Sequence, residues 1–219
     1  MALLQKTFNV LLMTTLIGCG PKEPKSDAKQ DLSIGIVADC QYCHCEATTS
    51  RFYKNSPKKL QNAVDSLNNL RLDYAIHLGD FIDRDFSSFD TVGPIWNTLK
   101  TKKYQVLGNH DFSVADSLKP LVPGKMNLKQ RYYSFVEQDW RFLVLDGNDL
   151  SYQGAITAEK IAQTDSLFTL LSQSNPPNLQ KWNGGLSMKQ LEWVEGELNL
   201  ALKNKENVGF YCHFPVLGE

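Results

Sequence analysis

The stretch Ile34-Gly-Ile-Val-Ala-Asp39-Cys-Gln41 decides the fold of this chain. It is a short, β-branched apolar run that ends in polar side chains, a pattern typical of a buried strand followed by a loop. Three later stretches repeat the pattern: His77-Leu-Gly-Asp80-Phe-Ile-Asp83, Leu107-Gly-Asn109-His110-Asp111 and Val208-Gly-Phe-Tyr-Cys-His213. Ligands bind outside the carboxyl ends of strands in open α/β sheets, so we expect these four strand ends to converge on one site.

The segments between the motifs predict an α/β fold. Apolar spacing predicts strands over residues 33–38, 74–78, 104–107 and 208–212, and helices over residues 52–70, 89–100, 156–174 and 187–203. Two aromatic, β-branched runs predict a hairpin over residues 131–136 and 140–145. Alternating strands and helices imply parallel pairing with right-handed crossovers, and 219 residues suffice for one such domain.

The charge balance argues against nucleic acid as a partner. The formal net charge is -1 and the pI is about 6.4. A protein that neutralises many phosphates needs a basic face, and this composition does not indicate one.

The first thirty residues have a different character from the rest. Lys6 precedes an apolar stretch, residues 8–17, which is shorter than the roughly 20 residues of a spanning helix. The following Leu16-Ile17-Gly18-Cys19 resembles the lipobox of a bacterial lipoprotein, so residues 1–18 are expected to be a signal peptide that is cleaved on export. The resemblance implies that Cys19 is lipidated, that residues 19–30 form a polar tether, and that the protein is periplasmic or at the cell surface. Its contact with the membrane would then be the lipid anchor alone.

Beyond Cys19 the sequence holds Cys40, Cys43, Cys45 and Cys212. Thiols can pair in the oxidising compartment that an exported protein meets. Because Cys43 and Cys45 are too close in sequence to bridge easily, we expect any disulfide to join Cys40 to Cys43 or to Cys212. A zinc knuckle that includes His44 remains open, although a second ligand pair at conventional spacing is lacking.

The motif side chains are those of a metal centre. The candidate ligands are Asp39, Gln41, Asp80, Asn109 and His213. Carboxylate, amide and imidazole groups suit Mn, Fe, Zn or Mg better than a thiolate zinc site. Two ions about 3.5–4 Å apart need a bridging carboxylate, and Asp80 is the candidate for that position.

The third motif also supplies candidate catalytic residues. His110 follows a ligand without being one, so we expect it to contact a phosphate oxygen or to protonate a leaving group. Asp111 is expected to orient the His110 ring.

Candidate substrate contacts lie at Arg51, Phe112, Asn183 and Gly184. Phe112 could stack on a base or belong to the core, and Arg51 could bind phosphate or lie at a solvated helix start. Asn183 and Gly184 form a turn that could line the pocket.

Together the four motifs resemble those of the calcineurin-like metallophosphoesterases, whose pattern runs D-x-H, G-D-x-x-D, G-N-H-[DE], a lone His and G-H-x-H. Gln41 stands where most members have His. The D-x-Q-Y start, residues 51–56, residues 140–146 and Asn183-Gly-Gly185 are similar to the manganese-dependent ADP-ribose/CDP-alcohol diphosphatases. The resemblance covers residues 31–219 and implies a sandwich of two β-sheets flanked by helices.

The resemblance implies two divalent ions, Mn²⁺ before Fe, Zn or Mg, and a metal-bridging hydroxide that attacks a phosphoanhydride. Asp39 and Gln41 would hold one ion, Asn109 and His213 the other, and Asp80 both. The implied substrate is a small phosphorylated nucleotide such as ADP-ribose or a CDP-alcohol. Open alternatives are a phosphomonoesterase or cyclic nucleotide phosphodiesterase on the same site, and a non-catalytic lipoprotein with a vestigial metal site.

The sequence contains no Gly-His-x-His. We therefore expect the domain over residues 31–219 to lack its last part and the gene product to continue by about 60–100 residues, from usual domain size. On that expectation, the 219-residue chain alone would bind metals poorly.

Overall fold

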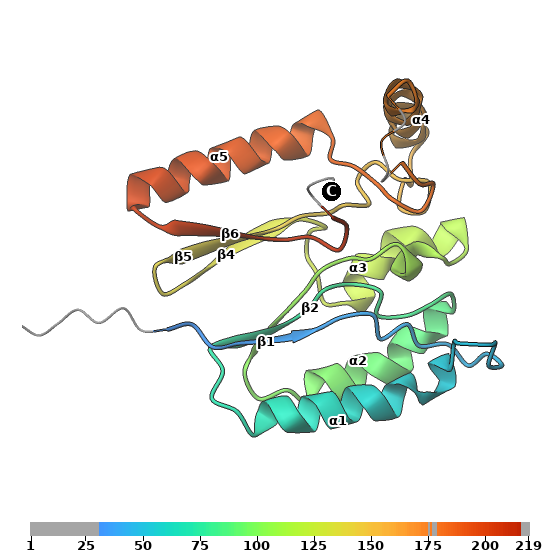
Figure 1. Ribbon diagram of the computed structural model, residues 1–219, viewed down its shortest axis with the longest axis vertical. Helices are drawn as coiled ribbons and strands as arrows, with labels where there is room; N and C mark the ends of the chain where they lie inside the picture. The colour runs from blue at the N-terminus through green and yellow to red at the C-terminus, as the bar shows by residue number, and fades with distance from the viewer. Residues whose placement is uncertain (1–30, 175, 177–178, 216–219) are drawn as a thin grey trace, which may run out of the picture. The chain divides into compact units, whose positions relative to one another are not determined.

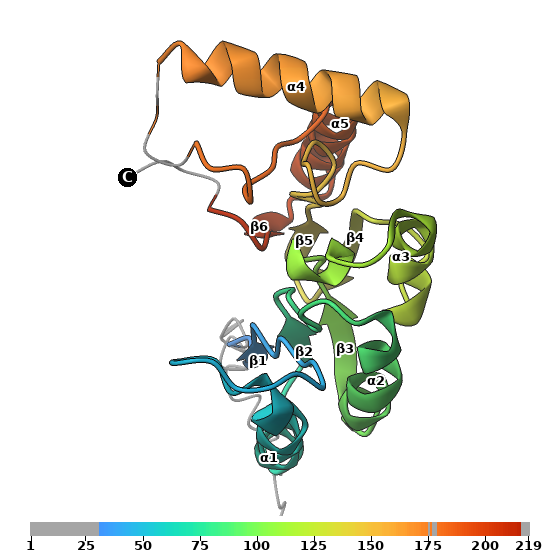
Figure 2. The same ribbon diagram turned by 90° about the vertical axis from the view of Figure 1, so that its right-hand side faces the viewer.

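The structure is a computed structural model that describes residues 31–174, 176 and 179–215. The expected signal peptide, the tether and Cys19 lie outside the described residues. All described elements from Leu32 onward belong to one unit. In this part of the chain, the strands form two three-stranded sheets, as Figures 1 and 2 show.

The first sheet is parallel and carries three of the four motifs. Its strands are β1 (Ile34–Val37), β2 (Tyr74–His77) and β3 (Lys102–Gln105), in the order β1-β2-β3. The register pairs Val37 with His77 and His77 with Gln105, so the carboxyl ends of all three strands are level. The loops that follow these strands therefore leave the sheet at one edge, as predicted.

Two helices cover the outer face of this sheet (Figure 1). Helix α1 (Ser56–Asn68) begins later than predicted, because a 3₁₀ turn at Tyr53–Asn55 precedes it and a proline occupies its first turn, where a missing N–H costs least. Helix α2 (Phe89–Asn97) continues through Pro94. Their apolar faces pack on the sheet in a core that includes the fully buried Val64 and Trp96.

The second sheet combines an antiparallel hairpin with a parallel strand. The predicted hairpin is present as β4 (Tyr133–Glu137) and β5 (Trp140–Val144), and β6 (Asn207–Tyr211) pairs with β5 in parallel. Helix α5 (Met188–Asn204) lies on this sheet (Figure 2), and Arg141 of β5 anchors it through an ion pair with Glu197 at 2.8 Å. Ser187 caps the start of α5 by accepting a hydrogen bond from the Gln190 backbone. Helix α4 spans Ala158–Ser172.

Aromatic rings join the two sheets. The ring of Tyr74 on β2 makes edge contacts with Phe135 and Phe142 of the second sheet, at centroid distances of 5.2 and 5.5 Å. The hydroxyl groups of Tyr74 and Tyr211 lie 2.7 Å apart. These contacts pack the sheets face to face, which confirms the predicted sandwich of two sheets with flanking helices.

The cysteine pairing differs from the expectation. Cys43 and Cys45 form a disulfide, while Cys40 and Cys212 are free thiols. The expectation of a bridge to Cys40 or Cys212 was wrong because the chain turns at residue 44 and places the Cα atoms of Cys43 and Cys45 5.3 Å apart, within the range that a disulfide spans.

Within the described ranges, no helix has both the length and the apolar character that crossing a bilayer requires.

Candidate metal centre

Positive φ angles at the ends of β1 and β2 direct the side chains of the first two motifs toward the same region. Asp39, Gln41 and Asp80 have φ angles of 53°, 45° and 55°, in the left-handed region that costs a non-glycine residue about 1–2 kcal/mol. Backbone bonds continue the pairing of β1 and β2 beyond the strands, from Asp39 N to the Gly79 carbonyl and from Gln41 N to the Asp80 carbonyl, at 3.2 and 2.8 Å. Such strain at consecutive strand ends is typical of functional sites.

Two glycines allow the second and third motifs to touch. A Cβ atom on Gly108 would lie 2.2 Å from the backbone nitrogen of Asp80, and one on Gly79 would lie 2.7 Å from that of Gly108. Gly79 also has φ of 97°, which side-chain-bearing residues rarely adopt. Only glycine fits at these two positions.

The five predicted metal ligands meet around Asp80. Ligand atoms of Asp39, Asp80 and His213 all lie within 4.8 Å of one another. Nε2 of His213 lies 3.4 Å from Oδ1 of Asp80 and 3.2 Å from Oδ1 of Asn109. Gln41 Nε2 donates to Oδ2 of Asp80 at 2.8 Å. Asp39, Gln41 and His213 therefore lie next to Asp80, and Asn109 joins the group through His213.

The charge and orientation of these groups fit a divalent cation. Burial and then the nearby charge of Asp80 raise the pKa of Asp39, which means that the two carboxylates repel each other without a cation between them. Nδ1 of His213 lies 2.9 Å from the Leu78 carbonyl oxygen, so it donates there and leaves Nε2 facing the cluster. Metal-binding histidines are held in the same way by a second hydrogen bond.

The partner of His110 is not the predicted one. Nδ1 of His110 lies 2.7 Å from Oδ1 of Asp83, and its Nε2 lies 4.0 Å from Oδ2 of Asp80. Asp83 is 2 % exposed and also pairs with Arg84. Asp83 thus contacts both His110 and Arg84.

Asp111 organises the backbone instead of the His110 ring. Its fully buried carboxylate accepts from the backbone N–H groups of Asp80, Phe81, Ile82 and Gly108, at 2.8–3.2 Å. Burial and then the charge of Asp80 raise its pKa to about 8, although the N–H groups of Gly108, Ile82 and Phe81 lower it. Its expected role as the orienting group of His110 therefore falls to Asp83.

Phe112 is placed in the core, which corrects its proposed role in base stacking. Its side chain is 1 % exposed, and the Arg131 guanidinium lies 4.6 Å from its ring centroid. No face of the ring remains for a substrate. Arg51, in contrast, is exposed, with its guanidinium 5.9 Å from the ring centroid of Tyr53.

Asn183 and Gly184 line a small cavity of about 70 Å³ beneath α4, which Phe214 also lines. A Cβ atom on Gly184 would lie 2.1 Å from the Gly147 carbonyl oxygen. Gly184 therefore packs closely on the loop that follows β5, and Phe214 links this cavity to the neighbouring His213.

A larger cavity of about 330 Å³ opens beside Asp39, between the end of β1 and the start of α1. Tyr53, Ser56 and Lys59 line it. Sequence reasoning did not single out Ser56 or Lys59. The available signal was their position in the first turn of a helix that follows a metal-type motif.

The fold and this donor cluster define a class of metal-dependent phosphohydrolases. The calcineurin-like phosphoesterase family model matches residues 32–218, and the chain belongs to this family. It is therefore a hydrolase of phosphoric esters or anhydrides.

Relatives within the family are named manganese-dependent ADP-ribose/CDP-alcohol diphosphatase. The Arabidopsis thaliana protein is 30% identical, with 87% of this chain and 70% of the relative covered. The Danio rerio and Homo sapiens proteins are each 28% identical, covering 84% and 89% of this chain and 70% and 69% of the relatives. A crystal structure of a dimetal phosphatase from Danio rerio is similar with a TM-score of 0.71 and 28% identity, over 85% of this chain and 70% of that one.

Proposed function

We propose that this protein is a two-metal, manganese-dependent phosphohydrolase that cleaves the phosphoanhydride of nucleotide diphosphate-linked substrates such as ADP-ribose and CDP-alcohols. The observation that carries the proposal is the meeting of Asp39, Asp80 and His213, whose ligand atoms lie within 4.8 Å of one another. The names of the relatives support the substrate class and the metal.

The donors divide between two ions that share one carboxylate. Asp39 and Gln41 would hold one ion, Asn109 and His213 the other, and Asp80 both. Bound ions of this kind supply an activated water and neutralise charge on the phosphoryl oxygens. Oxygen and imidazole donors without thiolate fit Mn²⁺.

His110 completes the site from the side of the substrate. Asp83 holds its Nδ1, so its Nε2 is the free atom, 4.0 Å from Oδ2 of Asp80. From there it donates a hydrogen bond to a phosphate oxygen or a proton to the leaving oxygen, while Asp83 stabilises the charged ring.

The cavity beside Asp39 suits the nucleotide part of the substrate. Its volume of about 330 Å³ falls within the usual range for small-molecule sites. Lys59 and Tyr53 line it together with the metal ligand Asp39, so it offers a cation for a phosphate and an aromatic ring for a base or ribose.

The test measures Mn²⁺-dependent hydrolysis of ADP-ribose, CDP-choline and p-nitrophenyl phosphate by the purified full-length gene product. We expect the two nucleotides to be cleaved at the anhydride, and Asp80→Asn to abolish cleavage. Lys59→Ala should raise KM for ADP-ribose by about 10–100-fold, the effect of losing one hydrogen bond to a charged group. Its exposed neighbour Lys58→Ala is the matched control and should leave KM unchanged.

Two results would overturn the proposal at different levels. Hydrolysis of p-nitrophenyl phosphate without cleavage of either nucleotide would contradict the substrate class and favour a phosphomonoesterase. Absence of bound metal after dialysis against Mn²⁺ would contradict the metal centre itself.

A further inference from the structure

A second group of metal-type side chains lies beside the centre and shares no ligand with it. The sulfur atoms of Cys43 and Cys45 and a carboxylate oxygen of Asp83 lie within 4.8 Å of one another. We propose that these three residues form a thiolate site for a zinc-type ion when the disulfide between Cys43 and Cys45 is reduced. The zinc knuckle that the sequence left open included His44, whereas the proposed site takes Asp83 as its third ligand.

Backbone pairing holds Cys43 beside Asp83 whether or not the sulfurs are bonded. Parallel pairing of β1 and β2 continues past the metal centre, with Tyr42 N donating to the Phe81 carbonyl at 3.3 Å and Asp83 N donating to the Tyr42 carbonyl at 3.0 Å. These bonds place Cys43 next to Asp83 in register. Backbone contacts therefore preorganise two of the three ligands, and Cys45, two residues from Cys43, supplies the third when the sulfurs separate.

The burial of the three groups differs in a way that suits such a site. Cys43 is fully buried and Asp83 is 2 % exposed, while Cys45 is partly exposed. Cys45 is therefore the sulfur that an external thiolate can attack. Two thiolates and a carboxylate carry more negative charge than one divalent ion offsets, and Arg84, which is paired with Asp83, supplies a further positive charge.

Opening the disulfide requires an external dithiol as the reductant. The dithiol delivers two electrons and two protons to the disulfide, becomes a disulfide itself, and leaves two thiols at Cys43 and Cys45. Binding of a divalent ion then releases both thiol protons to solvent. The ion gains two sulfur ligands and one oxygen ligand, and water fills the fourth position of the tetrahedron that zinc prefers.

The two sites select different ions. Thiolates favour Zn²⁺ and similar soft or borderline ions, whereas the oxygen-rich centre around Asp80 suits Mn²⁺. Occupation of the thiolate site also has a consequence for the centre, because Asp83 is the group that holds Nδ1 of His110. An ion on Asp83 competes with His110 for the carboxylate, so zinc should inhibit the reduced protein; this consequence rests on the proposed function.

Cobalt provides a readout that is independent of hydrolysis. Co²⁺ bound by thiolate gives an intense near-ultraviolet charge-transfer band, which oxygen and nitrogen ligands do not give. The protein is first saturated with Mn²⁺, reduced with a dithiol, desalted without oxygen and then titrated with Co²⁺. We expect the band to saturate at one equivalent in the reduced protein and to be absent from the oxidised protein.

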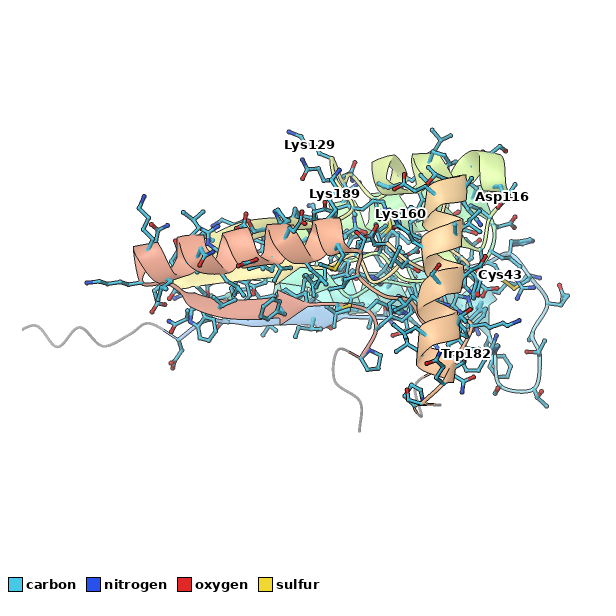
Figure 3. All side chains as sticks on the ribbon, turned by 90° about the horizontal axis from the view of Figure 1, so that it is seen from above. Cys43, Asp116, Lys129, Lys160, Trp182 and Lys189 are labelled. Carbon is cyan, nitrogen blue, oxygen red and sulfur yellow. A yellow bond between two sulfur atoms is a disulfide. The ribbon has the colours of Figure 1, made fainter. Side chains whose placement is uncertain are left out.

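Variants assign the band to these cysteines. Cys45→Ser should abolish it, and because Cys45 is partly exposed, this variant should fold; circular dichroism confirms that it does. Cys43, which Figure 3 labels, is fully buried, so Cys43→Ser serves as a second test after the same check. Cys212→Ser removes a free thiol outside the cluster and should keep the band.

The proposal fails if the reduced protein shows no band, or if the band persists in Cys45→Ser. Zinc inhibition confined to the reduced protein would support the link to His110. A protein that gives the band but hydrolyses no nucleotide would contradict the proposed function and leave the thiolate site standing.

Discussion

Nδ1 of His110 lies 2.7 Å from Oδ1 of Asp83, although the adjacent Asp111 is closer in sequence. Asp111 turns away to bind four backbone N–H groups. The two carboxylates thus have separate roles: Asp83 acts on the ring of His110, and Asp111 acts on the loop that carries Asp80.

Asp83→Asn should lower kcat by about 10–100-fold, the usual effect of removing the group that orients a functional histidine. An amide cannot stabilise the charged ring of His110, whereas substrate and metal contacts remain. KM and manganese content should therefore change little, which steady-state kinetics and elemental analysis measure. The exposed Asp85→Asn is the control and should behave as wild type. Loss of manganese from Asp83→Asn would mean that Asp83 acts on the metals instead.

Asp111→Asn should destabilise the fold by about 1–3 kcal/mol, because the amide NH₂ would face backbone donors that need an acceptor. The free energy of unfolding in urea measures this effect. Asp116→Asn is the matched control, since Asp116 is exposed (Figure 3) and pairs with Lys119 three residues away. That substitution should change stability by no more than about 0.5 kcal/mol. Equal stability of the two variants would refute the structural role of Asp111.

The ligand set was predictable because each ligand follows a strand whose apolar character marks its end. Asp39, Asp80 and Asn109 needed only the rule that carboxyl ends of parallel strands share an edge. His213 follows β6 of the second sheet, and it meets Asn109 because the two sheets pack on each other. The sequence could not choose the partner of His110, since Asp83 and Asp111 both lie near it in the motifs. The close contact of Gly79 and Gly108 sets the geometry of the two loops, and this geometry brings Asp83 to His110.

The end of the third strand could not be predicted from the sequence. Residues 104–107 were predicted as the third strand because Val106 and Leu107 are apolar, and both are fully buried. The strand β3 is nevertheless Lys102–Gln105. Burial continues beyond its end, so burial did not mark where the strand pairing stops. The direction of the Phe112 ring was also unpredictable, because a position after a functional motif does not show whether a side chain faces the site or the core.

The lipobox at Cys19, which lies outside the described residues, predicts that the protein is lipidated. We propose that the protein is an exported lipoprotein, so the wild type expressed in bacteria should fractionate with membranes and incorporate labelled palmitate. Cys19→Ser should remove the label, because the thiol that carries the lipid is gone. Cys212→Ser is the control and should retain the label. Palmitate incorporation into Cys19→Ser would contradict the assignment.

Gly108→Ala should disrupt the metal centre. The added Cβ atom would lie 2.2 Å from both the backbone nitrogen and Oδ1 of Asp80, so the loop that carries Asp80 must move. We expect manganese content to fall and stability to drop by about 1–3 kcal/mol, the usual range for overpacking. Gly196 is the matched control: it lies within α5, and a Cβ atom added there would have no neighbouring atom within 4 Å, so Gly196→Ala should keep the metals and raise stability by about 0.5–1 kcal/mol. If Gly108→Ala instead keeps both manganese and stability, the contact between the second and third motifs does not set the position of Asp80.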